Sequence, residues 1–184
     1  MTKKKEKRKP NLVVNIPPAT EFKASDAKTA ARLSYRQLND WGTKGALAGS
    51  RDSDSANWRR FNPNQLFVVS LCSEVRKAFS VPLDRLGWLQ NEMLKDGRDY
   101  FQVAVNFMSQ GYSVWLLTDL TEGLVMDPDV EFQQLIATGY FRDDDTGTAF
   151  IFVNVNPIVN RILGCLKEPV QLKVNPNAYK QFNK

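Results

Sequence analysis

The fold is decided by the stretch from Leu33 to Leu47, which reads LSYRQLNDWGTKGAL. Ser34 is a favourable N-cap, and Gln37, three residues later, completes the capping box with which helices often begin. Gly45 lies where such a helix should end, because glycine adopts the left-handed conformation of the C′ position at no steric cost. The stretch therefore predicts a short helix over residues 34–44.

This helix is amphipathic, and a second helix is expected just before it. Leu38 and Trp41 fall on one face and leave polar side chains on the other faces. Ser25 fits the N-cap of a helix over residues 26–32, in which three alanines allow close packing. Two short helices joined by a tight turn form a helix-turn-helix, whose second helix enters the major groove of DNA.

A polar loop and a basic segment follow these two helices. Residues 48–57 are small and polar, which is typical of an exposed loop. Residues 58–61, Trp-Arg-Arg-Phe, are predicted to return as the second strand of a small wing. Because side chains alternate along a strand, burial of Phe61 draws Arg59 inward and leaves Arg60 as the safer contact for a phosphate.

The rest of the chain predicts further helices and a few strands. Asn62, Pro63 and Gln65 form another strong helix start, which opens a largely apolar helix to about residue 78. Helices are also expected over residues 82–97, 99–109, 127–137 and 156–166, and strands over 112–118, 124–126 and 148–155. The last two helices are expected to begin with Asp-Pro and Asn-Pro caps. The predicted fold class is α+β, an N-terminal winged helix-turn-helix followed by a small α/β domain.

Charge and composition divide the chain into segments. We expect a flexible basic arm over residues 1–21, the winged helix-turn-helix domain over 22–97, a small α/β dimerisation or sensing domain over 98–168 and a C-terminal tail over 169–184. Residues 1–10 carry six cations against one carboxylate, residues 22–86 eleven against six, and residues 87–184 eight against twelve. A basic front half indicates a polyanionic partner, and contacts made by the arm would be independent of sequence and sensitive to salt.

The composition argues against an enzyme or a metalloprotein. The chain has no histidine, which removes most zinc sites and the histidine-activated nucleophiles. Cys72 and Cys165 suit neither a disulfide framework nor a metal site, and Cys72 lies on an apolar helical face as a small hydrophobe. The triplet at residues 143–145 lacks the ligand spacing of a calcium loop and predicts a loop tip. We expect no enzymatic activity, no metal and no cofactor.

The remaining patterns concern location and the core. The sequence contains no run of about 18 apolar residues and no secretory signal, so we expect no membrane association and a cytoplasmic, nucleoid-associated protein. Four aromatic residues are expected in the core rather than in a ligand cage: Trp88, Trp115, Phe150 and Phe152.

Arg36 is the foremost candidate for a DNA contact. At the third position of the capped helix, its guanidinium can reach a phosphate or the acceptor edge of guanine. Arg51 in the following loop can add a phosphate contact, although Asp52 and Asp54 beside it weaken that prediction. The full set of predicted DNA-binding residues is Ser34, Tyr35, Arg36, Asn39 and Lys44 on the helix, with Arg51, Trp58, Arg59 and Arg60 on the loop and wing.

Taken in order and at these spacings, residues 22–95 resemble the winged-helix DNA-binding domain of MerR-type transcription regulators. The motifs are Leu-Ser-Tyr-Arg-Gln-Leu-Asn-Asp-Trp at 33–41, Gly-Ala-Leu at 45–47, Trp-Arg-Arg-Phe at 58–61 and Ser-Val-Pro-Leu at 80–83. The resemblance implies that Ser34, Tyr35 and Arg36 lie at the major groove. It also implies that Arg59 and Arg60 hold the wing to the phosphate backbone.

The chain departs from that family in three places. Asn39 and Asp40 stand where members often carry Arg-Tyr, and a carboxylate there repels phosphate. The helix expected from Pro82 stops at Gly97, which leaves fewer than three heptads for the long dimerising helix of the family. The cysteines of the metal-sensing members have no counterpart, so metal sensing is not expected.

The sequence thus predicts a sequence-specific, DNA-binding transcription regulator that reads the major groove with helix 34–44 and clamps phosphates with a wing. Its expected partner is double-stranded DNA, and a homodimer and an effector or protein partner bound through the C-terminal half stay open. One alternative is an excisionase-like or architectural DNA-binding protein of a mobile element. The other is a protein-interaction module whose helix-turn-helix does not bind DNA, which Asp40 and the acidic back half favour.

Overall fold

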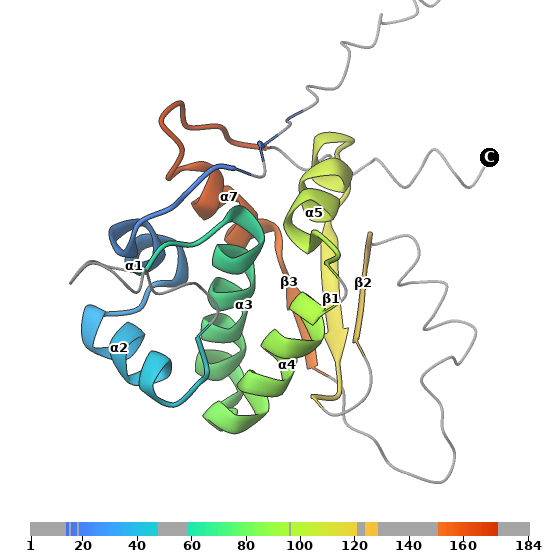
Figure 1. The fold of residues 1–184 in the computed structure, drawn as a ribbon. Coiled ribbons are helices and arrows are strands. Elements are labelled where there is room, and N and C mark those ends of the chain that lie inside the picture. Colours follow the sequence, from blue (N-terminus) through green and yellow to red (C-terminus); the bar gives the residue numbers. More distant parts are fainter. Residues whose placement is uncertain are drawn as a thin grey trace, which may run out of the picture.

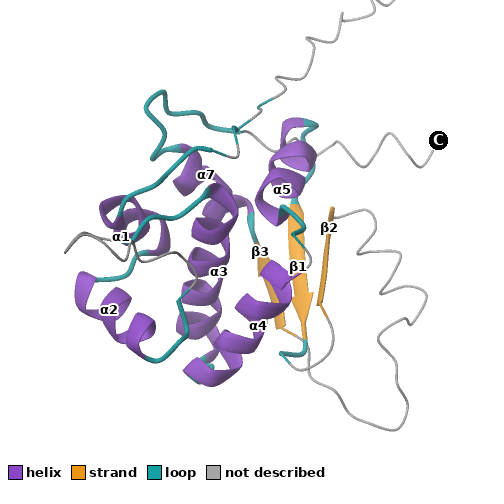
Figure 2. Ribbon diagram, viewed as in Figure 1, coloured by secondary structure: helices purple, strands orange, loops and turns teal. Residues whose placement is uncertain are grey.

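The computed structural model describes residues 14, 16–17, 19–47, 59–95, 97–120, 124–128 and 151–172. The described helices are α1 (Ala24–Ala31), α2 (Tyr35–Thr43), α3 (Pro63–Phe79), α4 (Leu83–Lys95), α5 (Tyr100–Ser109) and α7 (Asn156–Leu163). Beside them lies a small sheet of β1 (Val114–Thr118), β2 (Leu124–Pro128) and β3 (Ile151–Asn154), as Figures 1 and 2 show. The mixture of helices with a small sheet confirms the predicted α+β class.

Two of the predicted helix starts are confirmed by their capping boxes. Ser34 Oγ accepts a hydrogen bond from the Gln37 N–H at 3.2 Å, and the Ser34 N–H donates to Gln37 Oε1 at 2.9 Å. Asn62 and Gln65 make the same pair of bonds at 2.8 and 2.9 Å at the start of α3. Gly45 has φ of 70° just after α2, as a C′ glycine should. Local sequence therefore determines where these helices begin and end.

The prediction for the start of α1 is wrong by two residues. The N-cap is Lys23 rather than Ser25, and the helix ends at Ala31. The Lys23 N–H donates to the Asp26 carboxylate at 2.7 Å, so an acidic side chain in the first turn satisfies the backbone donor of the N-cap residue itself. Arg32 then leaves the helix in the left-handed region, with φ of 53°.

The sheet is antiparallel in the order β2-β1-β3. The predicted strands near residues 112–118 and 124–126 are present, but Asp127 and Pro128 extend β2 instead of capping a helix, because they pair with Trp115 and Val114. β3 occupies Ile151–Asn154 within the predicted strand. The remainder of the helix predicted over 127–137, the loop tip at 143–145 and the start of the strand predicted at 148 lie outside the described residues.

The last helix, α7, differs from its prediction at both ends. Its N-cap is Val155 rather than Asn156, and it ends at Leu163 instead of residue 166. The Asn156 side chain is buried and accepts a hydrogen bond from the Val114 N–H at 2.9 Å, so it joins the helix to the sheet. The Asn-Pro pattern predicted a local cap, but the asparagine side chain makes a long-range contact with β1 instead.

α3 forms the centre of the core. Ten of its 17 residues are buried, and it packs against α1, α4, α5 and α7 (Figure 1). The ring centroids of Phe67 in α3 and Phe101 in α5 lie 6.1 Å apart. One hydrophobic cluster extends from Val14 to Leu172, so the segments predicted as domains 22–97 and 98–168 share it. The boundary between those segments stays a prediction.

Two core predictions have opposite outcomes. Cys72 is fully buried in α3, and burial raises the pKa of its thiol, as suits a small hydrophobe. Phe152, expected in the core, is instead 42% exposed on β3. Trp88 and Trp115 are partly buried, and Phe150 lies outside the described residues. None of the described helices is both long and apolar enough to cross a bilayer.

Candidate nucleic-acid interface

The turn between α1 and α2 consists of three residues, 32–34, which positions the second helix. Arg32 reverses the chain in its left-handed conformation, Leu33 is buried beneath it, and Ser34 caps α2. On the inner face of α2, Leu38 and Trp41 are buried in the core. These anchors hold α2 at one edge of the described structure (Figure 1). The helix therefore has one fixed apolar face and one face available to a partner.

Five of the predicted DNA-binding residues lie on the outer face of α2 or at its two ends. These five residues are exposed, Tyr35 to 40%: Ser34, Tyr35, Arg36, Asn39 and Lys44. They offer hydroxyl, phenol, guanidinium, carboxamide and ammonium groups, all of which hydrogen-bond to phosphates or base edges. Tyr35, Arg36 and Asn39 thus share one exposed side of α2, and Ser34 and Lys44 lie at its two ends.

Lys28 joins this face, although the sequence reading did not single it out. Its Nζ lies 5.3 Å from the centroid of the Tyr35 ring, a cation–π contact between the last turn of α1 and the first turn of α2. The two residues are separated by seven positions and meet only because of the intervening turn. No helical or strand periodicity in the sequence signals such a contact.

Asp40 is paired with a cation of the same face. Its carboxylate forms an ion pair with Lys44 Nζ, which lies 3.0 Å away and one helical turn further along the chain. This pair neutralises the carboxylate that the sequence marked as a source of repulsion. Because the two side chains are 48% and 55% exposed, their attraction is weak, and Lys44 can exchange Asp40 for another anion at small cost.

Arg59 packs against the C-terminal end of α2. Its Nη1 donates to the Leu47 carbonyl at 3.5 Å, and a Cβ added at Gly42 would collide with its guanidinium. Phe61 beside it is buried and forms an antiparallel bridge with Phe22, just before α1. Arg59 is half-buried against α2, but Arg60 is half-buried as well, so burial does not separate the two arginines as the predicted alternation required. The role of Gly42 in admitting the Arg59 guanidinium was not foreseen.

Of the other residues predicted for the loop and wing, only Arg60 is described. Arg60 is half-buried. Arg51 and Trp58, with the rest of the segment 48–58, lie outside the described residues. The part of the predicted wing that the structure describes is therefore its return, residues 59–61, bridged to the segment that leads into α1.

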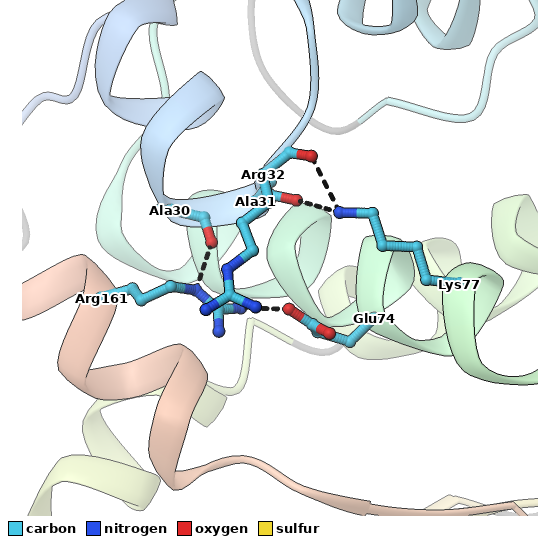
Figure 3. Close-up of polar contacts among 6 residues, drawn as sticks. All are labelled: Ala30, Ala31, Arg32, Glu74, Lys77 and Arg161. Atoms are coloured by element: carbon cyan, nitrogen blue, oxygen red, sulfur yellow. Dashed lines mark hydrogen bonds and ion pairs between the residues drawn. The ribbon is translucent and has the colours of Figure 1, made fainter.

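The C-terminal end of α1 is held by cations from two other helices (Figure 3). Lys77 of α3 donates to the carbonyls of residues 31 and 32, at 3.4 and 2.8 Å. Arg161 of α7 donates from Nε to the carbonyl of Ala30 at 2.8 Å. These carbonyls are the orphan acceptors of a helix end, and the positive charges complement its dipole. We refer to these contacts as the α1 clip.

The α1 clip includes one carboxylate. Arg161 Nη2 lies 2.6 Å from Glu74 Oε1, with the two side chains 17% and 27% exposed. Burial lowers the pKa values of both Arg161 and Lys77, while the negative charge of Glu74 raises them. The clip ties α1 to the core immediately before the turn that presents α2. Sequence reading missed it, because Ala30 and Arg161 are 131 positions apart.

No group of histidine, cysteine or acidic side chains in the described residues is arranged to hold a metal ion. No protein-family model matches the chain, and no curated protein matches it either.

Proposed function

We propose that the protein is a sequence-specific DNA-binding transcription regulator that reads the major groove with α2. The observation that carries this proposal is the outer face of α2, where Arg36 and its polar neighbours project from a helix fixed by Leu38 and Trp41. An α-helix fits the major groove, and a rigidly held one presents its donors in a constant register. The three-residue turn to α1 supports the same interpretation.

The return at residues 59–61 is proposed to hold the phosphate backbone beside α2. Arg59 lies against Gly42, so its cation is fixed at the end of the helix rather than free in solution. Arg60, its neighbour, is the residue that we assign to phosphate contact. Fixed backbone contacts set the register in which the helix meets the bases.

The proposal is tested by selecting sequences from a random duplex library and measuring the affinity of the enriched sequence across a salt series. Arg36→Ala should lower that affinity by about 5- to 150-fold and relax the preference at one base position, as loss of a bidentate guanine contact does. Deletion of residues 1–10 should weaken all duplexes alike and flatten the salt dependence, since six cations are lost.

Arg98→Ala is the matched control, because Arg98 is an exposed arginine between α4 and α5. It should leave both affinity and preference unchanged. If the intact chain enriches no sequence, or if Arg36→Ala and Arg98→Ala behave alike, α2 does not read DNA. The interaction-module alternative then leads, and the Asp40–Lys44 pair, which cancels charge on α2, favours it.

A further inference from the structure

A cavity of about 360 Å³ opens between the C-terminal turn of α3, strand β3 and the start of α7. Its size is at the lower end of the range for small-molecule sites. Among the residues that line it are Arg32, Glu74, Phe79, Phe152, Asn154 and Arg161. This set combines guanidinium groups with exposed aromatic rings. The cavity is separate from the outer face of α2, but it shares Arg32 with the turn that precedes α2.

The cavity wall has an excess of positive charge. Arg32 and Arg161 line it together with one carboxylate, that of Glu74, and Lys77 lies close enough to have its pKa lowered by both guanidinium groups. Two guanidinium groups and one carboxylate therefore line the wall, and a third cation, Lys77, lies next to Arg32. Burial lowers the pKa of Arg161, the negative charge of Glu74 opposes this, and the like charge of Arg32 lowers the pKa again.

Arg32 differs from the other two cations because its side chain has no anchor in the part of the chain that the structure describes. Arg161 and Lys77 are both bonded to carbonyls at the end of α1. The Arg32 side chain makes no hydrogen bond or ion pair with any of the described residues, and Figure 3 shows it extending toward Arg161 and Glu74. Its five donors are thus available beside a cation that is already only partly compensated.

The mouth of the cavity is apolar. Three large hydrophobic side chains are exposed among the described residues, and two of them, Phe79 at 47% and Phe152 at 42%, line this one cavity. Single exposed hydrophobic residues need no explanation, but two at a concave site mark a surface suited to an apolar ligand. Asn154, two positions from Phe152 on β3, adds a carboxamide to the wall.

We propose that this cavity binds a small organic anion with an apolar body. Its carboxylate, sulfonate or phosphate group would lie against Arg32 and Arg161, and its body would cover Phe79 and Phe152. An inorganic anion would leave the two rings exposed, whereas a neutral hydrocarbon would leave the cationic excess uncompensated. The two features together select an amphiphilic anion, which a guanidinium fork binds through charge-assisted hydrogen bonds. This proposal does not depend on DNA binding.

The test uses anilinonaphthalene sulfonate, a fluorescent aromatic anion, titrated into the intact folded protein. Its uncharged parent, phenylnaphthylamine, is the matched probe without the sulfonate. Saturable binding of the sulfonate is expected, and Arg32→Gln should weaken it by at least about tenfold, as loss of a charge-assisted contact does. Arg98→Gln should leave it unchanged. The uncharged probe should bind more weakly and show no difference between wild type and Arg32→Gln.

A second variant keeps the test decisive if circular dichroism shows that Arg32→Gln does not fold. Phe79→Ala removes an exposed ring at the end of α3 and should weaken both probes, since it removes apolar contact without changing charge. Absence of saturable binding would overturn the proposal. Sulfonate binding that is the same in Phe79→Ala as in wild type would overturn it too, as would equal binding in a folded Arg32→Gln variant.

Discussion

Helices α2 and α3 begin with the same local device but have different environments. Each starts with a polar N-cap followed three residues later by a glutamine, and each capping box is complete. In α3, ten of 17 residues are buried, whereas in α2 only Leu38 and Trp41 are. The comparison shows that the capping signal determines where a helix begins and says nothing about what the helix contacts. Burial makes α3 the scaffold and leaves α2 a surface.

The largest expected effect comes from the scaffold helix. Phe67→Ala should lower the free energy of unfolding by about 3–5 kcal/mol, because it opens a cavity against Phe101 in the fully buried core. Asn39→Ala on the exposed face of α2 should change it by less than about 0.5 kcal/mol. Urea denaturation followed by far-UV circular dichroism measures both. Equal effects would contradict the division into scaffold and surface.

The α1 clip should have the next largest effect. Arg161→Ala leaves Glu74 and the Ala30 carbonyl without their partner, so we expect a loss of about 2 kcal/mol in the free energy of unfolding. A double-mutant cycle with Glu74→Gln isolates the ion-pair contribution. Lys95→Ala, which breaks the more exposed pair with Glu92, is the control and should cost less than about 1 kcal/mol. A similar loss in the control would remove the distinction between the two pairs.

The two capping boxes allow α2 and α3 to be compared directly, because the same kind of cap can be removed from each helix. Ser34→Ala and Asn62→Ala should each lower the free energy of unfolding by about 1 kcal/mol. Amide hydrogen exchange should separate them: the first variant should increase exchange in α2 alone, whereas the second should increase exchange across the core. Ser34→Thr, which keeps an N-cap hydroxyl, should restore slow exchange in α2. Uniform changes in both variants would mean that α2 is no more independent than α3.

The smallest effect on stability is expected at the exposed pair. Asp40→Asn should change the free energy of unfolding by less than about 0.5 kcal/mol, because both partners are about half exposed. Its affinity for duplex DNA should rise, since a negative charge is lost and Lys44 is released. Fluorescence anisotropy at two salt concentrations measures this, with Asp84→Asn on α4 as the control. A fall in affinity would instead indicate that Asp40 contacts a base, for example the amino group of cytosine.

The features that sequence predicted well are local. The starts of α2 and α3 and the glycine that ends α2 follow from residues within a few positions of one another. The start of α1 failed because a carboxylate in the first turn can serve any N-cap residue, including Lys23. The N-cap preference of serine was a weaker signal than that backbone contact.

The features that sequence missed depend on distant partners. Asp127 belongs to a strand because Trp115 pairs with it, and no short-range pattern reports that pairing. The cation–π contact between Lys28 and Tyr35 needs the geometry of the intervening turn. The cavity beside Arg32 combines residues from four separate elements or turns. Such sites require the fold before they can be recognised.

The hydrogen bond between Arg161 and the Ala30 carbonyl has a consequence for the order in which contacts form during translation. The ribosome makes α1 and α2 before α7, and Arg161, the α7 donor to the Ala30 carbonyl, is 131 residues downstream. At cellular elongation rates, that interval is on the order of ten seconds. Throughout it, the nascent helix pair has no partner for the Ala30 carbonyl from α7. The helix proposed to read DNA thus receives this support only after α7 has been synthesised.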